Sequence, residues 1–555
     1  MLKTQLAAGT VESAPLWYEF RQTRPEVLIP FVLYMLGVIV IAVIAHRYQK
    51  QSDFESEYYV GGRNFGAWVL AMSWVATLAS GGSFLGYPSR VYSYGWSMAF
   101  WVSGSSVTAI VGLGIVGKRI NRLARQTGAL TLVDLLRDRF ENNKIGIVYG
   151  MTIIFVTSIY LMAQFVAGAR ILESMLECRY ETGLVVFSLS VVAYTTYGGF
   201  RAVAWTDTLQ GIVMLIGIVI LVPFAVTAVG GLENATRQLA EREDVGARMR
   251  GLPQDKHAYL YGPGPQKIPT GSQNAQQRSE GPSAPDPWLP IGMGISFFML
   301  RSLGSVMMPT TVPRMLAFKD TRALRRALIL LAPYFLLMYG SSLITMNCAH
   351  ALDLGLAPNE SDLAVPELAK RVAPPWLAGF LIAAPFAAVM STVDSALLVI
   401  SATVVRDLVQ KNFRLSLTPR STKVLSYLVT GGTGVFAFGL ALSEPPFLQP
   451  LIIYYVGGGA SALFWPSLAT IYWRRTTAAG VLAGLIGGGL TFVMFDFFHP
   501  LDWVVQLHPF VYGFSLSGLL VWSVSRWTPA QDPQRIEVYF GRAPAGDAGP
   551  GSPAA

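Results

Sequence analysis

The sequence of 555 residues has few charged residues, few cysteines and few histidines. Charged residues make up 14% of the chain, against about 25% in ordinary soluble domains. The two cysteines exclude a disulfide-stapled framework, and the five scattered histidines form no metal-ligand cluster. The glycine- and lysine-containing phosphate loop of ATP-driven machines is also missing. Apolar residues are abundant instead: 52% of the chain is hydrophobic, and the mean hydropathy is +0.44.

Thirteen long apolar stretches predict membrane-spanning helices. A spanning helix needs about 20 apolar residues, because each residue rises ~1.5 Å and the hydrocarbon core is ~30 Å thick. The first stretch has no small-residue cleavage site, so we interpret it as an anchored helix and not as a removed signal peptide. We therefore expect an all-α polytopic membrane protein. The stretches lie at roughly 26–46, 64–86, 96–117, 146–169, 183–199, 206–230, 288–308, 327–347, 375–404, 424–443, 450–472, 478–497 and 509–527.

The basic residues predict the orientation of the chain. With the N-terminus outside, the cytoplasmic loops and the C-terminal tail hold 26 of the 42 Lys and Arg residues, and the short external loops hold five. Such a bias is typical of cytoplasmic loops. It explains the formal charge of +9 through membrane topology and not through nucleic-acid binding. We expect a multi-pass protein of the cytoplasmic (inner) membrane, with its N-terminus outside and its C-terminus inside.

Two glycine-interrupted spans, 64–86 and 288–308, each begin a block of five spans. The two blocks start on opposite sides of the membrane, which predicts an inverted repeat with a binding site where the broken helices meet. Cys178 and Cys348 both fall near the external face, where they either form a disulfide or are unrelated. The expected order is an external tail (1–25), an extra helix (26–46), the first repeat (64–230), a long flexible external loop (231–287), the second repeat (288–472), two further helices (478–527) and a disordered cytoplasmic tail (528–555).

The span 64–86 contains small residues and the pair Gly81–Gly82 near its middle. One interpretation is close helix packing, since Gly, Ala and Ser let membrane helices approach each other. The other is a broken helix whose freed carbonyl and amide groups face a cavity. Unpaired backbone is tolerated at that depth only where it is buried in protein or coordinates something.

The span 375–404 places Ser391 and Thr392 next to each other. Helical side chains lean toward the N-terminus, so both hydroxyls return toward the carbonyl of Ala388. These oxygens either form ordinary back-bonds or bind a cation. Oxygen ligands of this hardness suit a small alkali cation and suit a transition metal poorly.

Three charged residues in or beside the spans are candidate functional groups, because intramembrane charge is costly. Asp394 lies on the same helix as Ser391. Asp207 opens the span 206–230, where it is either an N-cap or a group on the exit route of a cation. Arg301 lies deep in the span 288–308, where it either forms an internal salt bridge, for example to one of those aspartates, or binds an anionic substrate.

With these residues identified, the chain resembles the sodium/solute symporter family. The resemblance rests on four stretches that, with the thirteen spans, extend over nearly all of residues 26–527. Two of them, YGGFRA with TDTLQG and FKDTRALRR, look most like the sodium/pantothenate branch of the family. The stretches are YYVGGRNFGAWVLAMSWVATLASGGSFLGYPS, YTTYGGFRAVAWTDTLQG, VPRMLAFKDTRALRRAL and AAVMSTVDSALLVISATVVRDL.

The resemblance implies a LeuT-type five-plus-five inverted repeat that works by alternating access. It matches Asp207 to an aspartate associated with sodium passage. By motif position, it implies sodium ligands at Ala76, Ala79, Ala388, Ser391 and Thr392. It implies substrate contacts at Ser80, Gly81, Ser83, Arg301, Ser305 and Pro309. Proline transporters of the family carry an aromatic residue at the position of Arg301, so the arginine favours a substrate with a carboxylate.

The sequence thus predicts a secondary transporter, not an enzyme, that imports a small organic anion such as pantothenate or a monocarboxylate. Na⁺ is the expected coupling ion, with Asp207 and Asp394 in its release, and no organic cofactor is expected. Two alternatives stay open. One is a symporter of the same fold coupled to H⁺ through Asp394 or Asp207. The other is a transporter-like membrane sensor that binds a solute in order to signal.

Overall fold

The structure is a computed structural model that describes residues 25–47, 54–241, 291–445, 448–498 and 507–541. The described residues are helical and include no strand; Phe65 and Phe318 form an isolated β-bridge. The helices are α1 (Pro25–Arg47), α2 (Phe54–Val60), α3 (Ala67–Leu78), α4 (Tyr87–Tyr94), α5 (Ala99–Ala109), α6 (Lys118–Thr127), α7 (Leu132–Phe140), α8 (Asn143–Leu176), α9 (Tyr180–Val229), α10 (Leu232–Glu241), α12 (Ile291–Met299), α13 (Val312–Ala317), α14 (Thr321–Leu352), α15 (Ala364–Val372), α16 (Pro375–Ala402), α17 (Pro419–Ala441), α18 (Leu448–Tyr472), α19 (Ala478–Phe498), α20 (Pro509–Trp527) and α21 (Pro533–Phe540).

Several of these helices are interrupted or extended by short segments of other helical geometry. Short 3₁₀ turns are η2 (Gly61–Arg63), η4 (Gly95–Met98) and η8 (Pro358–Leu363). Wider π-helical segments continue α5, α12 and α16 and lead into α4. They are η3 (Gly82–Gly86), η5 (Ile110–Gly117), η7 (Leu300–Gly304) and η9 (Thr403–Asn412).

Each of the thirteen predicted spans, in its described part, is largely helical, and some extend over two or three consecutive elements. Within the described residues, eight helices are long and apolar enough to cross a membrane, and the pair Ala67–Leu78 and Gly82–Tyr94, bent by 64°, makes a ninth. Helix α9 has 50 residues and would be about 75 Å long if straight, against ~30 Å of hydrocarbon. It carries two predicted spans, 183–199 and 206–230, so it must turn between them.

The turn in α9 is at Gly199. This residue has φ 63° and ψ −179°, a non-helical conformation between two helical segments. That region of backbone space is essentially restricted to glycine, because a Cβ atom would clash with the neighbouring peptide groups. The glycine therefore allows one continuous run of apolar residues to form two separate crossings.

Gly199→Ala is expected to destabilise the protein by about 1–3 kcal/mol, because alanine is strained at this φ and ψ. The measurement is the thermal unfolding midpoint of the purified protein in detergent. Gly431→Ala is the matched control, since a Cβ atom at this α17 glycine would have no heavy atom within 4 Å. We expect the control to be neutral or slightly stabilising. Equal midpoints for the two variants would contradict the role of Gly199.

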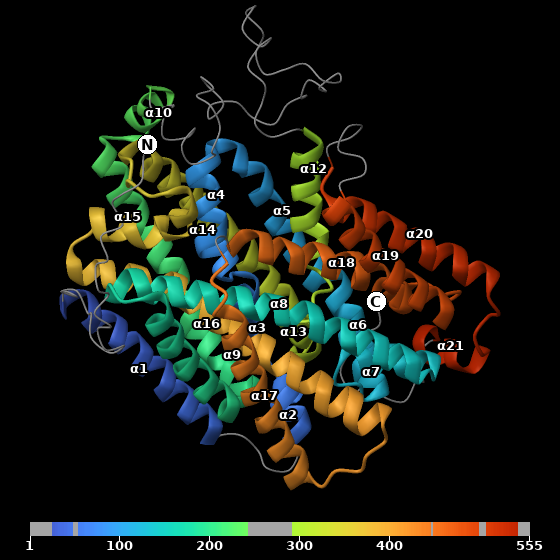
Figure 1. Cartoon of the computed structure of the whole chain (residues 1–555). Helices are drawn as coiled ribbons and strands as arrows, with labels where there is room; N and C mark the ends of the chain where they lie inside the picture. The colour runs from blue at the N-terminus through green and yellow to red at the C-terminus, as the bar shows by residue number, and fades with distance from the viewer. Residues whose placement is uncertain (1–24, 48–53, 242–290, 446–447, 499–506, 542–555) are drawn as a thin grey trace, which may run out of the picture.

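Helix α16 lies at the centre of the bundle. Of the residues in its most apolar stretch, 94% are buried, against 28% in α1. Helix α1 packs against α16 and α9 at one edge of the molecule, and α19 and α20 pack against each other and α18 at another edge (Figure 1). Helices α1, α19 and α20 therefore lie at the edges of the bundle, and α16 lies at its centre.

Two segments differ from the sequence prediction. The predicted disordered tail 528–555 contains helix α21, whose Tyr539 is buried and donates a hydrogen bond to the carbonyl of Leu135 at 2.9 Å. The prediction of disorder is thus wrong for Pro533–Phe540, because an aromatic side chain anchors this helix on α7. The predicted flexible loop 231–287 begins with helix α10, and its residues 242–287 lie outside the described residues.

Two further predictions concern the possible disulfide and the N-terminal tail. Cys178 and Cys348 are both free thiols, so the disulfide alternative is not realised. The predicted external tail 1–25 lies almost entirely outside the described residues, which start at Pro25.

Candidate functional site

The first broken helix contains the interruption that its small residues predict. Helix α3 ends at Leu78, and Ala79 has ψ 88°, so the chain leaves helical geometry before η3 begins. The freed amide of Gly81 donates to Oε1 of Gln164 on α8 at 2.8 Å, and that of Gly82 donates to Oγ of Ser80 at 3.1 Å. The predicted break in the helix is therefore confirmed, and these two freed amides are bonded to protein oxygens. Gln164, which supplies one of the missing partners, was not predicted.

The predicted hydroxyl-bearing patch brings α16 against α3 at this break. The Ser391 hydroxyl lies 2.8 Å from the carbonyl oxygen of Ala76 and 3.0 Å from that of Ala388. The Thr392 hydroxyl donates to the Ala388 carbonyl at 2.8 Å. Ala79, the fifth predicted ligand, is the first residue after the end of α3. These side chains are fully buried, and we call Ala76, Ala79, Ala388, Ser391 and Thr392 the hydroxyl patch.

The hydroxyl patch is a cluster of uncharged oxygen atoms in a dry environment. Two of its oxygens are hydroxyls that donate to carbonyls when no cation is present, and their lone pairs stay available. Carbonyl and hydroxyl oxygens are ligands of hard cations and not of thiophilic transition metals. The arrangement can therefore replace part of the water shell of an alkali ion.

Asp207 does not cap a helix. It lies inside α9, eight residues after the turn at Gly199, so the N-cap interpretation is wrong. The helix runs back from Asp207 through residues 202–206 toward Gly199, so no helix begins at Asp207. The Asp207 carboxylate instead accepts from Nη2 of Arg314 at 2.9 Å and from the hydroxyl of Ser73 at 2.6 Å.

Arg314 is the largest difference between the sequence prediction and the site. The sequence analysis places it in a cytoplasmic loop, but it lies on α13 and its side chain is 0% exposed. Its Nε donates to Ser73 at 3.0 Å, its Nη1 to the carbonyl of Thr310 at 3.0 Å, and its Nη2 to Ser395 at 2.7 Å. One guanidinium therefore joins α13, α3, α9 and α16.

The ion pair is connected to the hydroxyl patch through one serine. Ser395 lies one helical turn after Ser391 and donates to its carbonyl at 2.9 Å, while its hydroxyl accepts from Arg314. Asp394, by contrast, accepts from Tyr194 at 2.5 Å and from Thr195, both on α9. None of the hydrogen bonds among the described residues joins Asp394 to the hydroxyls of Ser391 or Thr392. The two aspartates thus have separate partners.

Arg301 lies on the second broken helix, in η7, and has no carboxylate within ion-pair distance among the described residues. Its Nε donates to Ser105 at 2.9 Å, and its Nη2 donates to the hydroxyl of Tyr339, above whose ring the guanidinium lies. Tyr339 also forms a 2.9 Å hydrogen bond with Ser83. The salt-bridge interpretation of Arg301 is therefore not realised in the described part of the chain. Its charge is surrounded by hydroxyl groups and an aromatic ring.

Three of the six predicted substrate contacts line one cavity. Ser80, Ser83 and Arg301 border a space of about 30 Å³, together with Tyr87, Trp101, Tyr339 and apolar side chains of α18. Gly81 is directed to Gln164, Ser305 is buried outside this cavity, and Pro309 lines a different one. Tyr339 and Trp101 are lining residues that the sequence analysis missed, since aromatic residues are common throughout the spans.

Comparison with known proteins agrees with this architecture. The family model described as the sodium:solute symporter family matches residues 58–488. A sodium/pantothenate symporter of Escherichia coli is 32% identical over 86% of this chain and 93% of its own length. One from Haemophilus influenzae is 32% identical over 83% and 88%. A sodium/proline symporter of Salmonella typhimurium is 26% identical over 93% and 97%.

Solved structures show the same fold at low sequence identity. A Na⁺-coupled sialic acid symporter in a substrate-bound outward-open state superimposes with a TM-score of 0.69 at 18% identity, over 91% of this chain and 99% of the other. Mhp1, a nucleobase-cation-symport-1 family transporter, gives 0.51 at 12% identity over 87% and 97%. These likenesses confirm the predicted LeuT-type helical fold. The chain belongs to the sodium:solute symporter family.

Proposed function

We propose that this sodium-coupled symporter imports a small organic anion, pantothenate-like or a short monocarboxylate, by alternating access. The observation that carries the proposal is the guanidinium of Arg301, which borders a cavity at the two broken helices with no carboxylate beside it among the described residues. A guanidinium matches the two oxygens of a carboxylate. The curated relatives with 32% identity, which are sodium/pantothenate symporters, support the same substrate class.

The coupling we propose is mutual stabilisation of sodium and substrate. Sodium bound at the hydroxyl patch bridges α3 and α16, and this fixes the broken helix whose Ser80 and Ser83 border the cavity. Substrate then binds better, and by linkage it must tighten sodium binding by the same factor. One sodium ion moving inward gains ~2.3 kcal/mol per 100 mV of membrane potential, before any concentration gradient is added.

The small size of the cavity fits an alternating mechanism. About 30 Å³ has room for a few water molecules, whereas an organic acid needs the surrounding helices to move apart. A Cβ atom on Gly82 would be 2.6 Å from Ile452 of α18, so η3 and α18 are in close contact. We propose that these two elements separate when substrate enters, and that Asp207 lies on the route by which sodium leaves.

Proton coupling through a buried carboxylate is the second candidate. Asp394 is fully buried inside the bundle and accepts hydrogen bonds from two hydroxyls of α9, and an ionisable group at such a depth is a functional candidate. The hydroxyl patch favours sodium over this alternative, because neutral oxygens offer no group that gains or loses a proton near neutral pH.

Arg301→Gln is expected to weaken the binding of anionic substrates at least tenfold and that of neutral solutes far less. The measurement is the substrate concentration that gives half-maximal uptake. Loss of a charged hydrogen bond costs about 1.5–3 kcal/mol. Arg301→Lys keeps the charge but not the forked geometry, so its effect should be intermediate. Equal losses for charged and neutral solutes would contradict a direct role in anion binding.

A substrate screen tests the proposed function as a whole. The purified protein is reconstituted in proteoliposomes, and an inward sodium gradient drives the uptake of labelled pantothenate, short monocarboxylates and proline. We expect accumulation of pantothenate or a monocarboxylate. Accumulation of proline with no uptake of any organic acid would overturn the proposed substrate class.

A further inference from the structure

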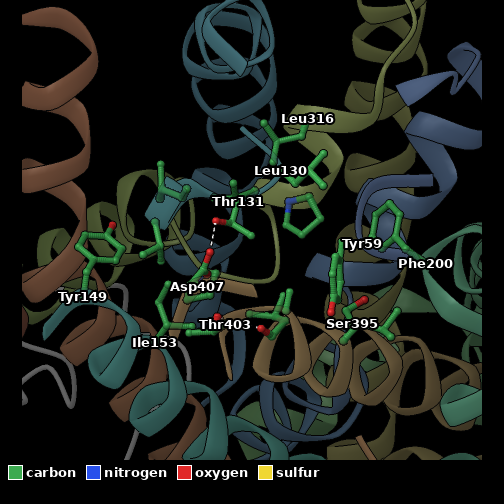
Figure 2. A pocket seen from close by; sticks show the side chains of 18 of the residues that line it. Tyr59, Leu130, Thr131, Tyr149, Ile153, Phe200, Leu316, Ser395, Thr403 and Asp407 are labelled. Carbon is green, nitrogen blue, oxygen red and sulfur yellow. Dashed lines mark hydrogen bonds between the residues drawn. The ribbon is translucent and has the colours of Figure 1, made fainter. Parts of the chain in front are cut away.

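A second cavity follows one face of α16 and η9 (Figure 2). It shares no lining residue with the cavity at Arg301. The residues of these helices that line it recur every three or four positions, as one stripe of a helix does. At one end is Ser395, which donates to the carbonyl of Ser391 in the hydroxyl patch. At the other end is Asp407, three helical turns further along. The stripe consists of Ser395, Leu398, Val399, Ala402, Thr403 and Asp407.

Asp407 is a buried carboxylate, and only one of its two oxygens accepts a hydrogen bond. Its side chain is fully buried, and Oδ1 accepts a 2.6 Å hydrogen bond from the hydroxyl of Thr131, as Figure 2 shows. Oδ2 has no hydrogen-bond partner in the described part of the chain. An ionised carboxylate in such a place is costly unless a cation joins it.

The nearby arginines are bound to other carboxylates. Arg406, the preceding residue, binds Asp134 at 2.8 Å and also Glu55. Arg137 binds Asp134 at 2.9 Å and Asp138 at 2.8 Å. Among the described residues, no Lys, Arg or His nitrogen lies within ion-pair distance of Asp407. Its Oδ2 therefore has no cationic partner among these protein groups.

The cavity has room for an ion, and one of its lining residues also borders a larger hollow. Its volume of about 40 Å³ fits a cation with a few water molecules and excludes an organic solute. Leu130 lines this cavity and also a hollow of about 640 Å³ that is bordered by Glu55 and Arg406. Leu130 therefore lies between the cavity and the hollow.

We propose that Asp407 and Thr403 form a second binding site for a monovalent cation, sodium, between the hydroxyl patch and this hollow. The Thr403 hydroxyl donates to the carbonyl of Val399 at 2.9 Å, so its lone pairs remain free to accept a cation. Thr131 holds the carboxylate in position. A hydroxyl, a carboxylate oxygen and water are ligands of a hard cation.

The site rests on the proposed function, since sodium reaches it from the hydroxyl patch. From Ser391 to Asp407 the distance along the helix is on the order of 20 Å. An ion that leaves the patch along this cavity passes Ser395 and then apolar side chains before it reaches the carboxylate of Asp407. The basic residues in the sequence assign the hollow to the cytoplasmic side, so Asp407 receives sodium just before its release.

The test measures sodium binding to a double variant that lacks the two hydroxyls of the hydroxyl patch. Ser391→Ala with Thr392→Ala removes both hydroxyls, and thermal unfolding in detergent is followed as sodium replaces choline at constant ionic strength. A ligand that binds the folded state raises the unfolding midpoint with its concentration. We expect sodium still to raise the midpoint of this double variant, and we expect Asp407→Asn, added to it, to abolish the remaining shift.

The outcomes separate the two proposals. A sodium shift that persists after Asp407→Asn, or a double variant with no shift at all, overturns the site at Asp407. A double variant that responds to sodium as the wild type does contradicts the hydroxyl patch. In that case, the presence or loss of the shift on adding Asp407→Asn still decides the role of Asp407.

A second variant keeps the test decisive if the asparagine variant fails to fold. Thr403→Val keeps the shape of the side chain and removes its hydroxyl. In the same background it should raise the sodium concentration for the half-maximal shift severalfold, and an unchanged concentration contradicts the site. Asp138→Asn is the matched control, because this carboxylate is 39% exposed, binds Arg137 and does not line the cavity. It should leave the sodium response unchanged.

Discussion

Arg314→Gln is expected to destabilise the folded protein by about 3–5 kcal/mol, the cost of breaking a buried ion pair by removing one partner. The carboxylate of Asp207 would then be left buried with only the hydroxyl of Ser73 as a described partner. The guanidinium also joins four elements of the bundle, so its loss removes contacts among α13, α3, α9 and α16. The measurement is the thermal unfolding midpoint in detergent, together with the amount of protein in the membrane.

The rescue variant for this pair is Asp207→Asn with Arg314→Gln. Arg314→Gln alone leaves the Asp207 carboxylate buried without its partner, and Asp207→Asn removes that charge. The double variant should therefore be clearly more stable than Arg314→Gln alone. Arg314→Lys keeps the charge but cannot keep the forked contacts, and it should fall between wild type and the glutamine variant. A double variant as unstable as the sum of the two single variants would contradict a direct interaction between Asp207 and Arg314.

Ser391→Ala with Thr392→Ala is expected to raise the sodium concentration for half-maximal uptake by tenfold or more. A hydrogen-bonding group that contacts a charge contributes about 1.5–3 kcal/mol, and 1.4 kcal/mol corresponds to a factor of ten. Folding should be largely retained, because the two hydroxyls bond to neutral groups: the carbonyls of Ala76 and Ala388 and, for Thr392, also the hydroxyl of Tyr160. The measurement is initial uptake rate against sodium concentration in proteoliposomes.

Ser401→Ala is the matched control for this prediction. Ser401 is a buried hydroxyl on the same helix that donates to the carbonyl of Ser426 at 3.2 Å, away from the patch. We expect its sodium dependence to equal that of the wild type. If the Ser391 and Thr392 double variant transports with an unchanged sodium dependence, the assignment of these hydroxyls as ligands is wrong.

The sequence predicts those features of this protein that depend on local pattern. Composition and length locate the spans, because lipid demands about 20 apolar residues per crossing. The pair Gly81–Gly82 predicts the break in the first repeat. Helical periodicity predicts that Ser391 and Thr392 return to Ala388. In each case the chemistry lies within one segment, so a neighbouring element is not needed to recognise it.

What the sequence does not reveal are partners from distant segments. Arg314 follows Val312–Pro313 and precedes several basic residues, a pattern typical of a surface loop, and only the fold shows that it is fully buried beside Asp207. Asp207 looks like a helix cap because nothing in its neighbourhood predicts that α9 continues through it. Gln164 and Asp407 are likewise ordinary polar residues in the sequence. Their significance depends on the broken helix and the cavity beside them.

The most direct test of the central claim compares uptake of the transported anion into proteoliposomes in sodium and in choline media at the same pH. The coupling that we propose, through the hydroxyl patch, predicts concentrative uptake in sodium and little or none in choline, with no requirement for an inward proton gradient. Uptake that is equal in the two media and is stimulated by external acid would contradict it and would favour proton coupling through Asp394 or Asp207.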